Sequence, residues 1–179
     1  MVYILLAPGF EEMEALIPAD LLRRAGIEVS LVGVAGEIVP GGHNIEVKCD
    51  CTLEQVDLSK CELVMLPGGG VGVKNLGEDP RVEALVRKAA EQDKWVAAIC
   101  AAPSLLNKWG LLTGRKAVCY PSWADRLDDA AFQPEEKLAL DGKFITGQAA
   151  GASFEFGLKL IEVLTDEETA RRIGKEICL

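Results

Sequence analysis

A single cysteine stands where a buried strand gives way to a helix, in the stretch VAAICAAPSLL at residues 96–106. The start of a helix carries unpaired N–H groups, and these groups together with the helix dipole stabilise an anion. Cys100 is therefore predicted to have a lowered thiol pKa and to act as a nucleophile. Ala101 and Ala102 are small enough for a tight turn that leaves the sulfur reachable. The alternative is a small buried hydrophobic residue, which free cysteine often is.

The acidic segment GFEEMEA holds a second group that suits proton transfer. Glu12 fits the first turn of a helix, where acids complement the helix dipole. Glu14 shares its helical face with Ile17 and Leu21, so it is predicted to point toward the core. A carboxyl group placed there needs a partner or a raised pKa, which makes Glu14 a candidate general acid or base. Glu11 is intermediate between the two faces.

The glycines of LPGGGVG could let backbone N–H groups approach a ligand closely. A dinucleotide fingerprint is not completed after Gly68 and Gly70, and no Gly-Lys-Ser/Thr follows for a phosphate loop. Two interpretations remain, namely an oxyanion hole built from backbone N–H groups and a simple tight loop.

The six cysteines show no disulfide framework, and free thiols are expected in a reducing compartment. A zinc site built from Cys49, Cys51, Cys61 and the single histidine, His43, is conceivable but disfavoured, and no metal is predicted. His43 lies in the loop segment PGGHN, and the sequence places it away from the loops at 8–14, 67–72 and 100–103.

Strands that alternate with helices predict an α/β fold with a mostly parallel sheet covered by helices on both faces. The expected strands are 2–7, 27–34, 61–66 and 95–99, with hairpins at 37–51 and 137–147, and the expected helices are 11–26, 80–92, 102–109, 152–165 and 166–177. Without a repeat or a linker, residues 1–179 are expected to form one domain. Ligands bind outside the carboxyl ends of strands in such sheets, which selects the loops at 8–14, 67–72 and 100–103.

The composition narrows the classes of partner. The chain has 179 residues, 49% of them hydrophobic, and a formal net charge of −9. The negative charge disfavours nucleic acid as a partner, because binding phosphates needs cations. No stretch is apolar and long enough to suggest a membrane span, and the N-terminus lacks the basic residues of a signal peptide, so a cytoplasmic protein is expected.

Three motifs in their order carry a resemblance to a known family. APGFEEMEA, LPGG and AAICAAP, followed by ASFEFGL, resemble the ThiJ/PfpI superfamily, also called the DJ-1/PfpI family. The similarity extends from about residue 2 to about residue 165 and is greatest to the protein-deglycase branch and its bacterial relatives.

This resemblance implies a flavodoxin-like three-layer sandwich that forms a homodimer and needs no cofactor. It implies that Cys100 is the reactive cysteine and that Glu14 is a buried glutamate sharing a proton with it. It implies backbone donors from the glycine loop and from the residue after the cysteine, which here are Gly68, Gly69 and Ala101. Activities of the family include cofactor-free glyoxalase and deglycase chemistry, redox sensing and chaperone action.

Two positions depart from the family pattern. Many members carry a histidine before a proline after the cysteine helix, and this chain has Tyr120 there. The deglycase branch has an arginine where this chain has Gln148, which predicts a weaker anion pocket. Cys119, next to Tyr120, is a candidate for resolving an oxidised Cys100.

The sequence thus supports three functions in order of preference. The first is a cysteine enzyme acting on small reactive aldehydes such as methylglyoxal or on their early adducts, with Cys100 and Glu14 as the catalytic pair. The second is a non-enzymatic redox sensor or chaperone that works through oxidation of Cys100. The third is a cysteine amidase or peptidase, which would need a base that the chain lacks.

Overall fold

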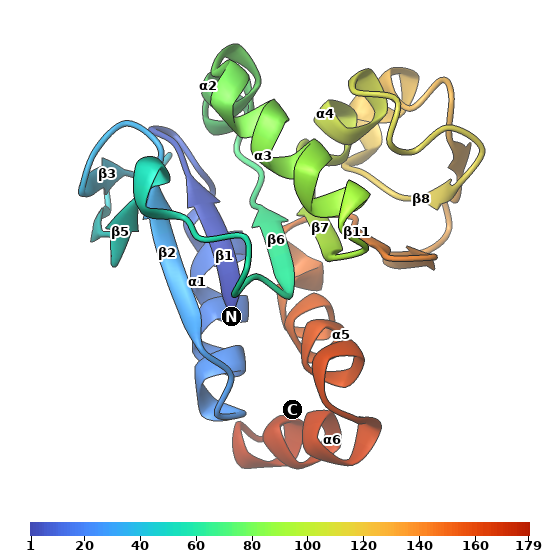
Figure 1. Ribbon diagram of the computed structural model, residues 1–179. Helices are drawn as coiled ribbons and strands as arrows, with labels where there is room; N and C mark the ends of the chain where they lie inside the picture. Colours follow the sequence, from blue (N-terminus) through green and yellow to red (C-terminus); the bar gives the residue numbers. More distant parts are fainter.

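A seven-stranded sheet runs through the protein, and the computed structural model describes all residues 1–179 (Figure 1). Its strands follow the order β10-β11-β7-β6-β1-β2-β5. Every neighbouring pair is parallel except β10 and β11, which form an antiparallel hairpin. This is the flavodoxin-like α/β arrangement that the sequence predicts.

The strands of this sheet are β1 (Val2–Leu6), β2 (Val29–Gly33), β5 (Cys51–Thr52), β6 (Leu63–Leu66), β7 (Trp95–Ile99), β10 (Leu138–Asp141) and β11 (Phe144–Gly147). Two further pairs lie outside it, the antiparallel β3 (Ile38–Pro40) with β4 (Glu46–Lys48) and the parallel β8 (Lys116–Ala117) with β9 (Ala131–Phe132). The α-helices are α1 (Glu12–Arg24), α2 (Gly70–Glu78), α3 (Pro80–Glu91), α4 (Pro103–Lys108), α5 (Ser153–Leu164) and α6 (Glu167–Glu176). The short 3-10 helices are η1 (Leu53–Gln55), η2 (Pro121–Arg126) and η3 (Ala150–Ala152).

Alternation along the strands divides the core into two layers, one on each face of the sheet. In β1, Tyr3 and Leu5 belong to a cluster with side chains of α2, α3 and α4, whereas Ile4 and Leu6 belong to a cluster with side chains of α1, α5 and α6. Both faces of each central strand are therefore buried, which explains the continuous apolar run of the sequence there. None of the helices is long and apolar enough to cross a membrane.

The close packing of α1 on α5 depends on a glycine. A Cβ at Gly157 would lie 2.7 Å from a methyl carbon of Leu21 and 3.1 Å from the Cα of Pro18. Helix α1 runs from Glu12 to Arg24 without interruption, although Pro18 lies inside it. This contact fixes the position of α1, and with it that of Glu14.

Most predicted elements are present, including both hairpins. One element was missed, because the sequence indicates only a loop after β6 whereas the structure has the helix α2. Glycine disfavours helix interiors, and GVGVKNLGE contains three glycines, so the local pattern conceals a helix that packing stabilises.

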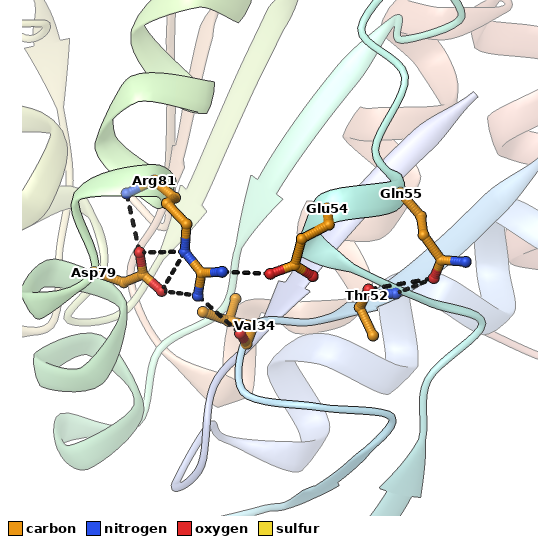
Figure 2. A network of polar contacts seen from close by, with 6 residues as sticks. All are labelled: Val34, Thr52, Glu54, Gln55, Asp79 and Arg81. Carbon is orange, nitrogen blue, oxygen red and sulfur yellow. Dashed lines mark hydrogen bonds and ion pairs between the residues drawn. The ribbon is translucent and has the colours of Figure 1, made fainter.

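A polar network anchors the end of α2 and the start of α3 to the neighbouring strands (Figure 2). The side chain of Asp79 accepts a hydrogen bond from the N–H of Arg81 at 2.9 Å and so caps α3. The Arg81 guanidinium in turn contacts the carboxylates of Asp79 and Glu54 and the carbonyl of Val34, at the end of β2. These contacts hold loops at the carboxyl ends of the strands in place.

Candidate active site

Cys100 occupies the turn between β7 and α4, at the carboxyl edge of the sheet. Its backbone has a φ of 65°, in the left-handed region that a residue with a side chain rarely adopts. Two hydrogen bonds hold this conformation: the Cys100 N–H donates to the carbonyl of Gly147 at 2.9 Å, and its carbonyl accepts from the N–H of Tyr120 at 2.8 Å. The strained turn aims the half-buried thiol back over the edge of the sheet, as an exposed nucleophile requires.

Glu14 reaches the thiol from α1. Glu14 is 1% exposed, as the helical spacing predicts, and its carboxyl group lies beside the side chain of Cys100, whose thiol acts to lower the pKa of Glu14. The N–H of Gly68 donates to Oε2 of Glu14 at 2.9 Å and fixes the carboxyl group from the other side. The fold thus brings together a thiol and a carboxyl group that lie 86 residues apart in the sequence, at positions 100 and 14.

Gly68 has a different role from the one that the sequence predicts. It was expected to offer its N–H to a substrate oxyanion, but that N–H is already bound to Glu14. A Cβ at Gly68 would collide with the carboxylate of Glu14 and lie 2.6 Å from the Cβ of Cys100. Only glycine therefore lets the loop come close enough to hold the Glu14 carboxyl group beside the thiol.

Two other backbone donors face the sulfur. The N–H groups of Gly69 and Ala101 act to lower the pKa of the thiol, against the larger effects described below, and neither donates to a backbone carbonyl. Gly69 adopts a φ of 88°, which turns its N–H toward the cysteine. A pair of N–H groups beside a nucleophile is the arrangement that stabilises an oxyanion formed on the carbon it attacks.

The lowered thiol pKa predicted from the helix start is wrong for the protein at rest. Burial, the charge of Glu14 and its hydrogen bond outweigh the two N–H groups and raise the pKa of Cys100 to about 12. Helix α4 has only six residues, so its dipole is small. Burial also raises the pKa of Glu14 to about 7. The two groups titrate as a pair, which keeps one proton between them above about pH 7.

The three other residues that the sequence analysis singled out near the cysteine, Tyr120, Gln148 and Cys119, differ in exposure. Tyr120 is exposed, and its backbone N–H bonds to Cys100, so the position of the family histidine does lie next to the cysteine. Gln148 follows directly on Gly147, the acceptor of the Cys100 N–H. Cys119 is buried and burial raises its pKa to about 11, so its thiol is poorly reactive in this conformation.

His43 lies beside the site, contrary to its expected placement. The Nδ1 atom of His43 is 2.8 Å from Oε2 of Glu12 and 3.6 Å from Oε2 of Glu11, and its backbone N–H donates to Oε1 of Glu12 at 2.7 Å. Glu12 is 5% exposed rather than a solvated first-turn acid. The signal in the sequence is Gly41, where a Cβ would collide with the carboxylate of Glu12.

No cysteine takes part in a metal-type cluster. The side-chain ligand atoms of Glu11, Glu12 and His43 lie within 4.8 Å of one another, and this is the single group of its kind. The imidazole compensates the negative charge of the two carboxylates, and the hydrogen bond to Glu12 raises the pKa of His43. The conceivable zinc set of Cys49, Cys51, Cys61 and His43 is therefore not assembled.

Comparison with known proteins assigns the chain and its fold to a family. A sequence model described as the DJ-1/PfpI family matches residues 1–163. The chain belongs to the DJ-1/PfpI family. It is 38% identical over 174 residues to the protein dj-1beta of Drosophila melanogaster, covering 96% of this chain and 93% of the relative. The crystal structure of Drosophila melanogaster DJ-1beta superposes with a TM-score of 0.95 at 36% identity, covering 99% of this chain and 97% of that one.

Two further DJ-1 relatives bear on function. The glutathione-independent glyoxalase DJR-1.2 of Caenorhabditis elegans is 28% identical over 178 residues, 98% of this chain and 95% of the relative. The structure of Toxoplasma gondii DJ-1, oxidized, has a TM-score of 0.91 at 34% identity and covers 98% of this chain and 96% of that chain. Membership of the DJ-1/PfpI family supports a function of the DJ-1 kind in carbonyl or oxidative stress.

The raised pKa of Glu14 predicts a pH-dependent loss of stability. Because this pKa rises from 4.5 to about 7 on folding, the contribution of Glu14 is complete below pH 4.5 and is lost as the pH rises through about 7. Relative to Glu14→Gln, the free energy of unfolding of the native protein should fall by on the order of 3 kcal/mol between about pH 4.5 and about pH 8. Urea denaturation at a series of pH values measures it.

Glu135→Gln is the matched control for this comparison, because Glu135 is an exposed carboxylate. Its pH dependence should follow that of the native protein. Parallel curves for the native protein and Glu14→Gln would show that Glu14 ionises in the folded protein as it does in the unfolded chain, and would contradict the raised pKa.

The ion pair at the edge of the site can be observed directly, because His43 is the single histidine of the chain. Its imidazole protons should titrate in proton NMR with a pKa above 6.5. Glu12→Gln should return the pKa toward 6.5 because the hydrogen bond and the charge are lost. Glu46→Gln, on exposed β4, is the control. An unchanged titration in Glu12→Gln would mean that His43 does not contact Glu12 in solution.

Proposed function

We propose that the protein is a cofactor-independent cysteine enzyme that converts a reactive aldehyde such as methylglyoxal, or its early adducts, to a hydroxy acid such as lactate. The observation that carries this proposal is the buried Glu14 carboxyl group beside the Cys100 side chain, flanked by two N–H groups that no backbone carbonyl occupies. A relative named a glyoxalase adds support from the family.

The first step is attack of the sulfur on the aldehyde carbon. The Glu14 carboxylate takes the thiol proton as the carbon–sulfur bond forms, so a thiol with a raised pKa needs no free thiolate at rest. The electron pair of the aldehyde C=O moves to oxygen, which the N–H groups of Gly69 and Ala101 stabilise. Return of the proton from Glu14 to that oxygen completes a hemithioacetal.

The second step moves one proton between adjacent carbons. Glu14, again a carboxylate, removes the proton from the former aldehyde carbon and delivers it to the neighbouring carbon, while the hydroxyl proton of the hemithioacetal passes to the former ketone oxygen, which leaves a lactate thioester on Cys100. Water then hydrolyses the thioester and restores the thiol. The sum is methylglyoxal plus water to lactic acid, so the reaction needs neither an oxidant nor a reductant.

Loss of either member of the pair should abolish this chemistry. Cys100→Ala should convert methylglyoxal at the rate of buffer alone, and Glu14→Gln should lose about a hundredfold to ten-thousandfold of the rate, the range for a placed proton-transfer group. The kcat/KM of the native enzyme should rise with pH through about 7, because the carboxylate form of Glu14 accepts the proton. Lactate formation measured against pH tests all three expectations.

Cys178→Ala is the matched control, because Cys178 is an exposed thiol at the other end of the chain. It should keep the native rate. Turnover that survives in purified Cys100→Ala would rule out the sulfur as nucleophile. If kcat/KM of a His43→Gln enzyme no longer rose near pH 7, the imidazole and not Glu14 would be the general base.

A second candidate function is redox sensing, which the existence of an oxidized form of the related Toxoplasma gondii DJ-1 favours. Hydrogen peroxide would oxidise the Cys100 thiol to a sulfenic acid and be reduced to water, and a second equivalent would give the sulfinic acid. The N–H groups of Gly69 and Ala101 suit the oxygens of that product as they suit an oxyanion.

Mild peroxide should then add oxygen to Cys100 before the other five cysteines, because the Glu14 carboxylate can take the thiol proton as the sulfur attacks and the N–H groups of Gly69 and Ala101 face the oxygen that it gains. Peptide mass mapping after graded exposure measures the order. Oxidation of exposed Cys178 ahead of Cys100 would remove the support for a sensor.

The amidase or peptidase function has the least support. It needs a histidine in contact with the cysteine, whereas Nδ1 of His43 is bound to Glu12. Glu14 remains the base that contacts the thiol.

The family resemblance also supports a homodimer. Met13 on α1 and Ile38 and Ile45 of the β3–β4 hairpin are exposed, and the His43–Glu12 bond joins these two elements into one surface. Sedimentation velocity should give twice the chain mass, and Met13→Glu should lower it to the mass of one chain. A native protein that sediments as a monomer would exclude the dimer.

A further inference from the structure

Two carboxylates and one imidazole converge where α1 begins beside the β3–β4 hairpin. Nδ1 of His43 lies 2.8 Å from Oε2 of Glu12 and 3.6 Å from Oε2 of Glu11, and one ligand atom from each of the three side chains lies within 4.8 Å of the others. The side chain of Glu12 is 7% exposed and that of Glu11 is 19% exposed. These two groups are not solvated surface acids, so their charge has to be compensated at the site itself.

The compensation that the chain provides is incomplete. Neither Glu11 nor Glu12 pairs with a lysine or an arginine, so two carboxylates face one imidazole, which is charged only when it is protonated. Glu11 is the N-cap of α1, yet its side chain makes no capping hydrogen bond and has the imidazole as its one basic partner. Buried charges in proteins are either paired or coordinate a metal, and a divalent cation would neutralise both carboxylates at once.

Backbone contacts already hold the three side chains in position. The N–H of Gly42 donates to the carbonyl of Phe10 at 2.8 Å and ties the hairpin to the loop before α1. The backbone N–H of His43 donates to Oε1 of Glu12 at 2.7 Å, which fixes the carboxylate and directs Oε2 toward the imidazole. A Cβ at Gly41 would collide with this carboxylate, so the close approach depends on glycine. Outer contacts of this kind orient the ligands of a metal ion.

We propose that Glu11, Glu12 and His43 bind a zinc ion. The ion takes the place of the hydrogen between Nδ1 of His43 and Oε2 of Glu12, Oε2 of Glu11 is the third ligand, and water completes the coordination. Zinc–ligand distances of about 2.0–2.2 Å put neighbouring ligand atoms roughly 3.0–3.5 Å apart, so a small movement of the exposed imidazole admits the ion and no buried atom needs a new route to solvent. All three ligands belong to one chain, and binding requires neither the aldehyde chemistry nor the dimer.

The single histidine of the chain reports on this site directly. At about pH 8, where protons compete less for the ligands, Zn²⁺ should shift the imidazole proton signals of His43 in proton NMR of the full-length protein until one ion is bound per chain, and EDTA should reverse the shift. Mg²⁺ at the same concentration should leave the signals in place, because it takes oxygen ligands. Signals that Zn²⁺ does not move, or that Mg²⁺ moves equally, would overturn the proposal.

Substitution of each ligand tests the assignment by calorimetric titration with Zn²⁺. His43→Gln, Glu12→Gln and Glu11→Gln should each lower the association constant at least about tenfold, because even an outer partner of a metal site contributes about tenfold to a hundredfold. Glu46→Gln, on exposed β4, is the matched control and should bind as the native protein does. His43 is exposed, so its variant keeps the test valid if Glu12→Gln does not fold. Unchanged binding in His43→Gln would overturn the proposal.

Cys100→Ala decides between this site and the catalytic pair, because a thiolate is also a ligand of zinc. The variant should bind Zn²⁺ with the association constant of the native protein and show the same shift of the His43 signals. Binding that is lost in Cys100→Ala and retained in His43→Gln would place the ion on Cys100 and contradict the proposed site.

Discussion

A carboxyl group buried against a thiol is the constraint around which this edge of the sheet is built. Glu14 is almost fully excluded from water, and an ionised carboxylate there needs hydrogen bonds to replace its hydration. It has two partners, the Gly68 N–H and the Cys100 thiol. Meeting that requirement explains why Gly68 can carry no side chain and why the backbone of Cys100 adopts a left-handed conformation, with both its N–H and its carbonyl bonded.

The same constraint shapes the chemistry. A single proton shared between sulfur and carboxyl gives the site a nucleophile and a base in contact, without a histidine. Because the Gly68 N–H holds Glu14, the proposed oxyanion donors are the N–H groups of Gly69 and Ala101, one from each neighbouring loop. The placement of Tyr120 and Gln148 beside this pair then alters the rim of the site rather than the pair itself.

Local patterns in the sequence predict those features that depend on near neighbours along the chain. Helical spacing from Glu14 to Ile17 and Leu21 correctly places the carboxyl group in the core, and the strand-to-helix turn correctly places Cys100 at the carboxyl edge. The sequence predictions fail where contacts between distant segments determine the environment of a residue. The burial of Glu12 depends on His43, and the role of Gly68 depends on Glu14.

The thiol pKa shows the same division. A helix start favours a thiolate, and the sequence shows that start; burial and the charge of Glu14 act in the opposite direction and prevail, and neither can be read from the residues around Cys100. Helix α2 was missed because its glycines hide a segment that tertiary packing makes helical.

Infrared difference spectroscopy of the Glu14 side chain tests the shared proton most directly. In spectra of the native protein minus Glu14→Gln, a carboxylic acid C=O band should be present below about pH 7 and give way to a carboxylate band above it. Cys100→Ala should move that transition to higher pH, because the hydrogen bond from the thiol lowers the pKa of Glu14 and alanine cannot make it. A carboxylate band that persists down to pH 4.5, or a transition unaffected by Cys100→Ala, would contradict a proton held in common by Glu14 and Cys100.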